Sequence, residues 1–318
     1  MKKQYLILIA LGLTISLNAQ EPISPVVLTV PKPEIDASAI SMFAKPVKTL
    51  GTTLSGCLAG DCFYGFGYLI DADGKTEYIG NFKNGIIEGL GQIHMAGDNI
   101  IYTGYFENNQ PNGYGNINYY ANNLIEVGTF KNTAQDGEFT RYQFDDVQTV
   151  LYKNDQKTTI TRQTGCLLGD CSNGKGIYQK TDGSRIEGDF SDNRLVKGVV
   201  FESKFGVVKY DSIDINGQYN GNTVIFKPNG EVIYGTFKDS KMNGKMLIKA
   251  PKRSGYLYRE GVYENGQPKD ETILFRDGRK WVGVSDTAEE WATGKGTMTY
   301  PDGTTKTGKF YRGDFVSE

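Results

Sequence analysis

Residues 78–95 read YIGNFKNGIIEGLGQIHM, and this stretch contains the unit from which most of the chain is built. It opens with the pattern Tyr-x-Gly-x-Phe, whose marked residues are two apart and therefore share one face of a β-strand. Asn84-Gly85 then supplies the positive φ angles that a tight turn requires. A Gly-x-Gly at residues 89–91 leads into a second strand of alternating apolar and polar residues. The stretch therefore predicts a β-hairpin.

The same unit recurs along the chain at a regular spacing. Gly80, Gly104 and Gly128, the central glycines of three successive units, are 24 residues apart. Asp-Gly and Asn-Gly dipeptides, which favour two-residue hairpins, separate the second strand of a unit from the first strand of the next. Self-similarity at a fixed period is typical of a repeat architecture. Further copies of the first half are centred on Gly188, Gly235, Gly261, Gly283 and Gly308.

The two faces of the predicted sheet differ in composition. Ile93 and Met95 share the face of Gly91, whereas Gln92 and His94 lie on the opposite face. Later units again place mostly polar residues at these alternate positions, so one face is expected to be buried and the other largely wet. The pattern predicts one elongated antiparallel meander with almost no helix.

These residues resemble the MORN repeat family, whose units follow Tyr-x-Gly-x-Phe, a turn and then Gly-x-Gly. The resemblance covers roughly residues 51–315. It implies an all-β fold, an elongated single sheet of antiparallel β-hairpin repeats (a MORN solenoid or meander). It also implies a scaffold for protein interaction or for attachment to a membrane surface. Around residues 148–152 and 205–210 the central glycine is replaced, so bends are expected there.

The first residues predict an export signal. Lys2 and Lys3 precede an apolar run from Leu6 to Leu17, and Ala19 is the expected cleavage residue. An uncleaved membrane anchor is the alternative, although the run is shorter than the ~20 residues that span a bilayer. The protein is therefore expected to be exported: periplasmic, on the outer surface or secreted. The expected organisation is a signal peptide (1–19), a Pro-rich linker (20–50), a first MORN array (51–164) and a second MORN array (165–318).

All four cysteines lie in a duplicated motif, Gly-Cys-Leu-x-Gly-Asp-Cys. An even cysteine count in an exported chain favours disulfide bonds, and the local pairs Cys57–Cys62 and Cys166–Cys171 would each tie a turn. Free thiols and a single four-sulfur metal site are the alternatives. The metal site would bring two distant motifs within Zn–S bonds of ~2.3 Å, which an elongated array opposes. The duplication indicates that each array opens with a cysteine-bearing unit.

The charge pattern and the single histidine argue against several classes of function. The formal net charge is −2 and no basic stripe is present, so no nucleic-acid partner is expected. His94 is expected to be a solvated strand residue, and no nucleophile motif accompanies it. The sequence therefore predicts no enzyme, no catalytic residue, no cofactor and no metal.

Two functions remain after these exclusions. The first is a non-catalytic scaffold that binds a protein partner or envelope component, with a lipid head group implied by the family resemblance alone. The second is a periplasmic or cell-surface glycan-binding protein or hydrolase. An aromatic strip on the wet face would favour sugars, whereas an apolar patch would favour protein or lipid. Trp291 has the alternative of packing against the C-terminal end. The rings expected to reach a partner are Phe66, Tyr68, Tyr105, Tyr114 and Trp291.

Overall fold

The computed structural model describes most of the chain beyond the expected signal peptide and linker, which lie outside the described residues. Within the described residues the single helix is a three-residue 3-10 turn, η1 (Tyr120–Asn122), and β-strands make up most of the rest. No described helix is long and apolar enough to cross a membrane. The described residues are 55–318 except Asp73, 96–98, Asp145, 154–155, Arg162, 203–205 and 252–253.

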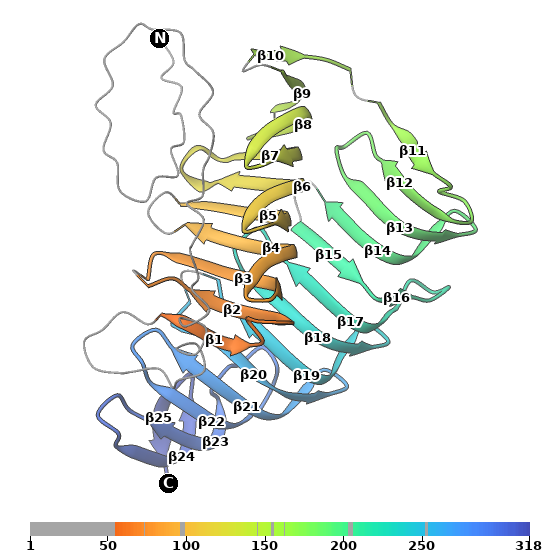
Figure 1. Cartoon of the computed structure of the whole chain (residues 1–318). Helices are drawn as coiled ribbons and strands as arrows, with labels where there is room; N and C mark the ends of the chain where they lie inside the picture. Colours follow the sequence, from red (N-terminus) through yellow and green to blue (C-terminus); the bar gives the residue numbers. More distant parts are fainter. Residues whose placement is uncertain are drawn as a thin grey trace, which may run out of the picture.

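The strands form two antiparallel sheets, and in each sheet they follow the order of the chain (Figure 1). Sheet 1 has ten strands and sheet 2 has fifteen, with β16 paired to β17 at the side of the main path. Sheet 1 comprises β1 (Gly56–Gly60), β2 (Phe66–Ile70), β3 (Thr76–Lys83), β4 (Ile86–Met95), β5 (Ile100–Glu107), β6 (Gln110–Tyr119), β7 (Leu124–Lys131), β8 (Ala134–Gln143), β9 (Asp146–Lys153) and β10 (Gln156–Thr159).

Sheet 2 begins at Gly165 and runs to the C-terminus. It comprises β11 (Gly165–Gly169), β12 (Lys175–Gln179), β13 (Arg185–Ser191), β14 (Arg194–Glu202), β15 (Gly206–Tyr210), β16 (Ser212–Ile213), β17 (Tyr219–Phe226), β18 (Val232–Lys238), β19 (Lys241–Lys249), β20 (Tyr256–Glu264), β21 (Gln267–Phe275), β22 (Lys280–Ser285), β23 (Gly294–Thr299), β24 (Thr305–Tyr311) and β25 (Asp314–Ser317).

The repeat glycines form a row across sheet 1. Gly80 faces Gly91 across β3 and β4, and Gly91 faces Gly104 across β4 and β5. The Tyr78 ring lies over this row so closely that a Cβ at Gly91 would sit 2.3 Å from the Tyr78 hydroxyl oxygen. Glycine is therefore needed here because only a missing side chain leaves room for the ring.

The rings of the repeat form a ladder on the face of the glycines. Tyr78 meets Phe82 and Phe106 edge-on, with ring centroids 5.1 and 5.3 Å apart, and Tyr102 repeats the arrangement with Phe106 and Phe130. Edge-to-face contacts of this kind are favourable beyond the area that they bury. The outer face of sheet 1 is therefore held by its own aromatic side chains.

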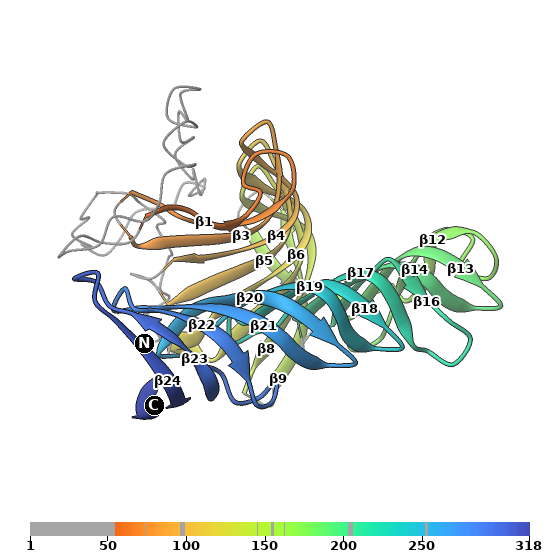
Figure 2. The same cartoon turned by 90° about the horizontal axis from the view of Figure 1, so that it is seen from below.

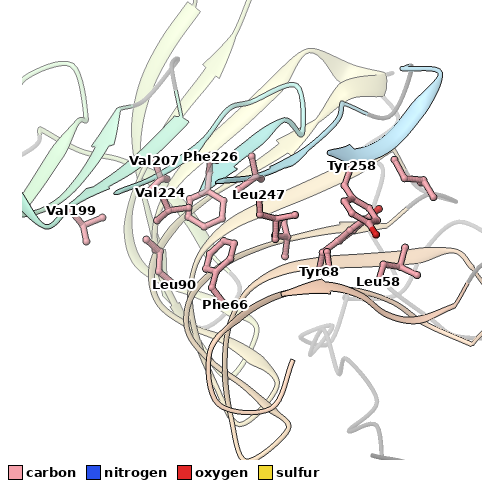
Figure 3. Close-up of a cluster of buried hydrophobic side chains, with 14 of the residues drawn as sticks. Leu58, Phe66, Tyr68, Leu90, Val199, Val207, Val224, Phe226, Leu247 and Tyr258 are labelled. Carbon is pink, nitrogen blue, oxygen red and sulfur yellow. The ribbon is translucent and has the colours of Figure 1, made fainter. Parts of the chain in front are cut away.

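The all-β antiparallel meander is confirmed, but the expectation of one elongated sheet is wrong. After β10 the chain turns back, and sheet 2 runs beside sheet 1 in the opposite direction (Figures 1 and 2). The reason is the composition of the alternate positions, which carry enough apolar side chains to form a shared core. Figure 3 shows that core, with Leu58, Phe66, Tyr68 and Leu90 from sheet 1 against Val199, Val207, Val224, Phe226, Leu247 and Tyr258 from sheet 2.

The face that the sequence predicted to be wet is thus mostly buried in sheet 1. Leu90, Gln92 and Tyr114 lie on this face and are all buried. Gln92 Nε2 donates a hydrogen bond to the Lys227 carbonyl of sheet 2 at 3.3 Å. Polar residues at the alternate positions therefore contribute contacts between the sheets.

Candidate interaction surface

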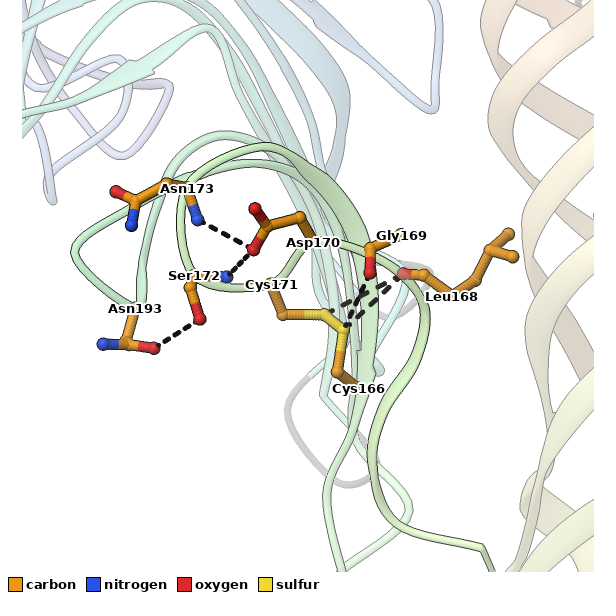
Figure 4. Close-up of a disulfide and its surroundings, with 8 residues drawn as sticks. All are labelled: Cys166, Leu168, Gly169, Asp170, Cys171, Ser172, Asn173 and Asn193. Atoms are coloured by element: carbon orange, nitrogen blue, oxygen red, sulfur yellow. Dashed lines mark hydrogen bonds between the residues drawn. A yellow bond between two sulfur atoms is a disulfide. The ribbon is translucent and has the colours of Figure 1, made fainter.

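The two cysteine turns have the predicted structure. Cys57 pairs with Cys62 at an S–S distance of 2.07 Å, and Cys166 pairs with Cys171 at 2.05 Å. In the second turn Asp170 accepts hydrogen bonds from the backbone N–H groups of Ser172 and Asn173 (Figure 4). These bonds hold the pKa of Asp170 below its usual value. The local disulfides are confirmed, and the aspartate acts as a turn former.

Three of the five rings expected to reach a partner are buried between the sheets. Phe66 stacks on Tyr234 of sheet 2 with centroids 3.9 Å apart, and Tyr68 meets Tyr258 edge-on at 6.2 Å. Tyr114 lies 5.0 Å from Phe201. The expectation that Phe66, Tyr68 and Tyr114 are exposed is wrong, because sheet 2 covers the face on which they lie.

The other two rings are half-buried and lie apart from each other. The Tyr105 hydroxyl donates a hydrogen bond to the Glu187 carboxylate at 3.1 Å. The Tyr105 ring centroid lies 5.6 Å from that of Phe201, at the margin of the core between the sheets. Trp291 packs against Tyr256 and Phe275, near the C-terminal end. The structure therefore does not bring the five rings together into one surface.

A buried ionic cluster ties the two sheets together. Glu77 of β3 lies 3.1 Å from the Lys249 ammonium of β19 and 3.5 Å from the Arg276 guanidinium. Tyr68 donates a hydrogen bond to the same carboxylate at 3.2 Å. His94 faces Glu77 across β3 and β4 and is buried, so the expectation that it is solvated is wrong.

Glu77 stays ionised in this cluster. Burial alone would raise the pKa of the Glu77 carboxyl, but Lys249, with help from Arg276 and His94, holds that pKa below its usual value. Burying charges is costly unless they are paired and hydrogen-bonded, and here each condition is met. The cluster is therefore a structural joint between the sheets.

Two further buried carboxylates have the same type of surroundings on the outer faces. Glu126 lies 2.6 Å from the Arg141 guanidinium and accepts a hydrogen bond from Tyr152 at 2.8 Å. Glu271 is paired with Arg259 and accepts a hydrogen bond from Tyr263. In each group an arginine and a tyrosine hydroxyl contact one buried carboxylate; in Glu271 both contacts fall on Oε1, and Oε2 is buried without a hydrogen-bond partner among the described residues.

Sheet 2 extends past β1 at its C-terminal end, where one of its faces is open. Lys280 of β22 is exposed and faces Leu274, a member of the core between the sheets, so the open surface continues that same side of sheet 2. Val282 and Val284, which alternate with Lys280 along β22, are 47% and 44% exposed. We call this surface, made of Lys280, Val282, Val284, Lys295, Thr297, Thr307 and Lys309, the C-terminal face.

The register of β22 to β24 fixes the layout of the C-terminal face. Val284 faces Lys295, which in turn faces Lys309, so two exposed ammonium groups lie beside the valines. The hydroxyl oxygens of Thr297 and Thr307 lie 2.9 Å apart on the neighbouring row. Sequence reasoning missed this surface, although valines at both alternate positions around Gly283 were a signal for it.

The C-terminal face rests on a packed layer. Trp281, Met298 and Phe310 lie on the opposite side of β22, β23 and β24 and are fully buried. A Cβ at Gly296 would sit 2.5 Å from the Trp281 ring, so the indole lies flat on the strand. The strands that carry the C-terminal face are therefore packed against a layer of buried side chains on their other side.

Comparison with known proteins identifies the repeat. The family model for the MORN repeat matches residues 78–96, 102–117, 172–185 and 292–305. None of the curated proteins matches the chain. Among solved structures, a mutant of the TCP10 domain of Danio rerio CPAP matches with 13% identity over 77% of this chain and 95% of that chain, at a TM-score of 0.19. The TCP domain of Drosophila melanogaster SAS-4, in complex with a proline-rich motif of Ana2, matches with 10% identity over 83% and 94% of the two chains, at a TM-score of 0.20. The first two matched segments lie in sheet 1 and the last two in sheet 2, so the chain carries MORN repeats in both of its sheets.

Proposed function

We propose that the protein is an exported, non-catalytic repeat scaffold that binds a protein partner through the C-terminal face. The observation that carries this proposal is the pair of exposed valines, Val282 and Val284, beside Lys295 and Lys309 on an open strand surface. Apolar side chains surrounded by polar ones are typical of protein interaction sites.

The physical properties of the surface favour this use. Its β-strands are fixed by the layer of Trp281, Met298 and Phe310 beneath them, so little conformational entropy is lost when a partner binds. The lysines give the edge of the surface a positive charge. A partner with acidic residues around an apolar centre is therefore the expected match.

The alternative function, glycan binding, is less well supported. Sugar recognition would use an exposed aromatic strip, but Phe66, Tyr68 and Tyr114 are enclosed between the sheets. The C-terminal face presents valines, threonines and lysines instead. An anionic lipid head group would also be attracted by the lysines, so the experiment below separates lipid from protein.

Export is supported by the two disulfide bonds. Disulfides form and persist in oxidising compartments, and both cysteine pairs of this chain are bonded. The periplasm, the cell surface and the medium all satisfy this condition.

The test compares capture of partners by the wild-type protein and by a double variant, Val282→Glu with Val284→Glu. The control is Ile215→Glu, which places one of these two negative charges at an exposed isoleucine on a turn outside the C-terminal face. Proteins from the native envelope are captured on each form after photo-cross-linking and compared by mass spectrometry. A partner that is lost with the double variant and kept with the control supports the proposal.

Two parallel measurements identify the other ligand classes. Sedimentation with phosphatidylcholine vesicles, with and without phosphatidylserine, detects binding to anionic lipid, and a panel of soluble glycans detects sugar binding. Binding to either one, abolished by the double variant and unaccompanied by a captured protein, would refute the protein-binding proposal.

A further inference from the structure

The N-terminal chain joins the described fold beside the C-terminal face. Gly56 begins β1 and lies in the same cross-strand row as Glu77, which contacts Lys249 of sheet 2. The row of Lys249 continues through Leu274 to Lys280 of the C-terminal face. Figure 1 shows β22, β23 and β24 lying beyond β1, which is the edge strand of sheet 1. Residues that precede β1 are therefore attached next to the C-terminal face.

The C-terminal face carries positive charge that is not paired within the described part of the chain. Lys280, Lys295 and Lys309 are exposed, and none of them forms an ion pair with another described residue. Glu260 is close enough to Lys280 for that lysine to oppose the rise that burial causes in the pKa of Glu260. Lys295 and Lys309 are therefore the lysines available to an acidic occupant.

One stretch of the N-terminal chain has the complementary pattern. Residues 21–36, which lie outside the described residues, read EPISPVVLTVPKPEID. The run VVLTV at residues 26–30 is bounded by prolines, and the only acidic residues of positions 1–54 flank it: Glu21, Glu34 and Asp36. Lys32 is the one basic residue among them. An apolar centre with acids on both sides is the chemistry that the valines and lysines of the C-terminal face would recognise.

The prolines around this run determine how it can lie on a surface. A residue that precedes a proline is disfavoured in the helical region, so Pro25 and Pro31 predict an extended backbone around the run. Alternate residues of an extended chain share one side, which places Val26, Leu28 and Val30 together. The run is therefore expected to offer three aliphatic side chains in a line.

We propose that residues 26–30 pack on the C-terminal face of the same molecule, with Leu28 against Val282 and Val284. The acids on either side of the run then lie near Lys295 and Lys309. Apolar contact supplies most of the stability of this arrangement, and the charges set its orientation. The segment covers the valines that a protein partner needs, so its regulatory effect rests on the proposed function: a partner binds only after it displaces the segment.

The position of the segment in the chain makes even a weak contact effective. Val30 and Ser55, the first described residue, are 25 positions apart, and a chain of that length can span at most about 80–90 Å. The segment can therefore reach a surface that begins beside β1. A short tether gives an effective concentration of about a millimolar, so a contact with a dissociation constant on the order of 10⁻³ M is occupied about half of the time.

Zero-length cross-linking tests the contact in the wild-type protein. A carbodiimide joins a carboxylate to an amine only where the two groups touch, and the purified exported protein is treated at low concentration. We expect cross-links from Glu34 or Asp36 to Lys295 or Lys309, and none to Lys175, which is exposed toward the opposite end of sheet 2. The absence of any cross-link to Lys295 or Lys309 would overturn the proposal. So would cross-links that join isotope-labelled to unlabelled chains in a mixture of the two, because the occupant would then be a second copy.

Leu28→Asp, with the matched control Thr29→Asp, tests the role of the apolar side. Both variants add one negative charge to the segment, but Thr29 lies on the side opposite Leu28 in an extended chain. Loss of the buried leucine should weaken the contact at least about tenfold, which takes a half-docked segment to about one-tenth docked and lowers the cross-linking yield about fivefold. Thr29→Asp should leave the yield close to that of the wild type. Equal yields in the two variants would contradict the proposed packing.

Capture of the partner from the native envelope separates this inference from the proposed function. Uncovering a half-docked face nearly doubles the fraction that can bind, so Leu28→Asp should bind the captured partner about twice as tightly as Thr29→Asp does. Equal affinities would show that the segment does not compete with the partner and would overturn the regulatory role. If the cross-links form and no partner is captured, the proposed function is refuted while the intramolecular contact stands. If a partner is captured and the cross-links are absent, the intramolecular contact is refuted while the proposed function stands.

Discussion

Replacing Glu77 by glutamine should strongly destabilise the protein. The change keeps the shape of the side chain but removes the negative charge that faces Lys249, whose side chain is only 1% exposed. The lysine would keep its hydrogen bonds to the carbonyl oxygens of Gly230 and Ala250, but not a counter-charge. Arg276 is 30% exposed and can turn toward water, so most of the cost falls on the lysine.

The expected size of the effect follows from the burial of this pair. Removing one partner of a buried ion pair typically costs about 3–5 kcal/mol, and the retained amide oxygen places Glu77→Gln near 3 kcal/mol. Glu264→Gln is the matched control, because Glu264 and Lys269 form a pair 3.0 Å apart that is mostly exposed. Exposed pairs contribute roughly 0–1 kcal/mol, so the control should unfold almost as the wild type does.

Urea unfolding followed by circular dichroism measures both variants. Adding Lys249→Met to Glu77→Gln removes the unpaired charge, and the double variant should recover at least about 2 kcal/mol, which is the coupling expected for direct contact. If Glu77→Gln and Glu264→Gln lowered the free energy of unfolding equally, or if the double variant regained none of it, the ionic cluster would not hold the sheets together.

The pH dependence of the stability difference between the wild type and Glu77→Gln provides a second check. The pKa of Glu77 is lower in the folded protein than its usual value of 4.5, so its stabilising effect is fully present above that value. The effect is lost as the pH falls through the folded-state pKa, because protonation then removes the same charge. The stability gap between wild type and Glu77→Gln should therefore shrink below a pH of about 4.5.

Three other outcomes are expected. Gly91→Ala should cost about 1–3 kcal/mol in urea unfolding, because the new Cβ would collide with the Tyr78 ring, whereas Gly255→Ala, whose Cβ would meet only Trp291 at 3.8 Å, should cost less than half as much. Replacing both Cys166 and Cys171 by serine should lower the free energy of unfolding by less than the ~3 kcal/mol expected for a disulfide that closes a 15-residue loop, because this disulfide closes a shorter loop. A larger loss of unfolding free energy would contradict this. Mass spectrometry of the exported protein should find a mature N-terminus directly after Ala19, and an intact Met1 would contradict cleavage there.

Local features of the fold follow directly from the sequence. The positive φ of Asn84 and Gly85, at 53° and 73°, matches the turn that these residues predict. The facing of Gly80 and Gly91 follows from the period of two along each strand. Both disulfides also lie within single turns, so their partners are close in the sequence. Such features depend on neighbouring residues, and neighbouring residues are what a repeat pattern specifies.

The packing of the two sheets was not predicted, because it depends on contacts between distant residues. Gln92 and His94 are polar, and in isolation they indicate a wet face. Their neighbours on that face include Ile79 and Leu90, which are apolar and buried against sheet 2. Whether a face with both polar and apolar residues is buried depends on what packs against it. No pattern within one unit reveals that sheet 2 returns to this position.

The candidate surface was missed for the same reason. Phe66 and Tyr114 were expected at the surface because rings at mostly polar positions usually reach solvent, but sheet 2 encloses both. Val282 and Val284 lie in the first half of their unit and Phe66 and Tyr114 in the second half, but all four occupy alternate positions on the side of a sheet that faces the other sheet. Val282 and Val284 lie beyond the part of sheet 2 that sheet 1 covers. Exposure of the alternate positions therefore differs along the chain with the extent of the opposite sheet.

The opposite directions of the two sheets have a consequence for the order in which the protein folds. Hairpins between neighbouring strands can form as soon as each unit has been made, but Gln92 reaches its partner Lys227 across 135 residues. Contacts of such long sequence separation form slowly, since the intervening chain must first be closed into a loop. Tyr68, Ile79 and Leu90 of sheet 1 therefore stay uncovered until β17 to β20 have been synthesised. We expect the newly synthesised chain to depend on a holding chaperone during this interval, and refolding from urea to show a slow, aggregation-prone phase that corresponds to the docking of the two sheets.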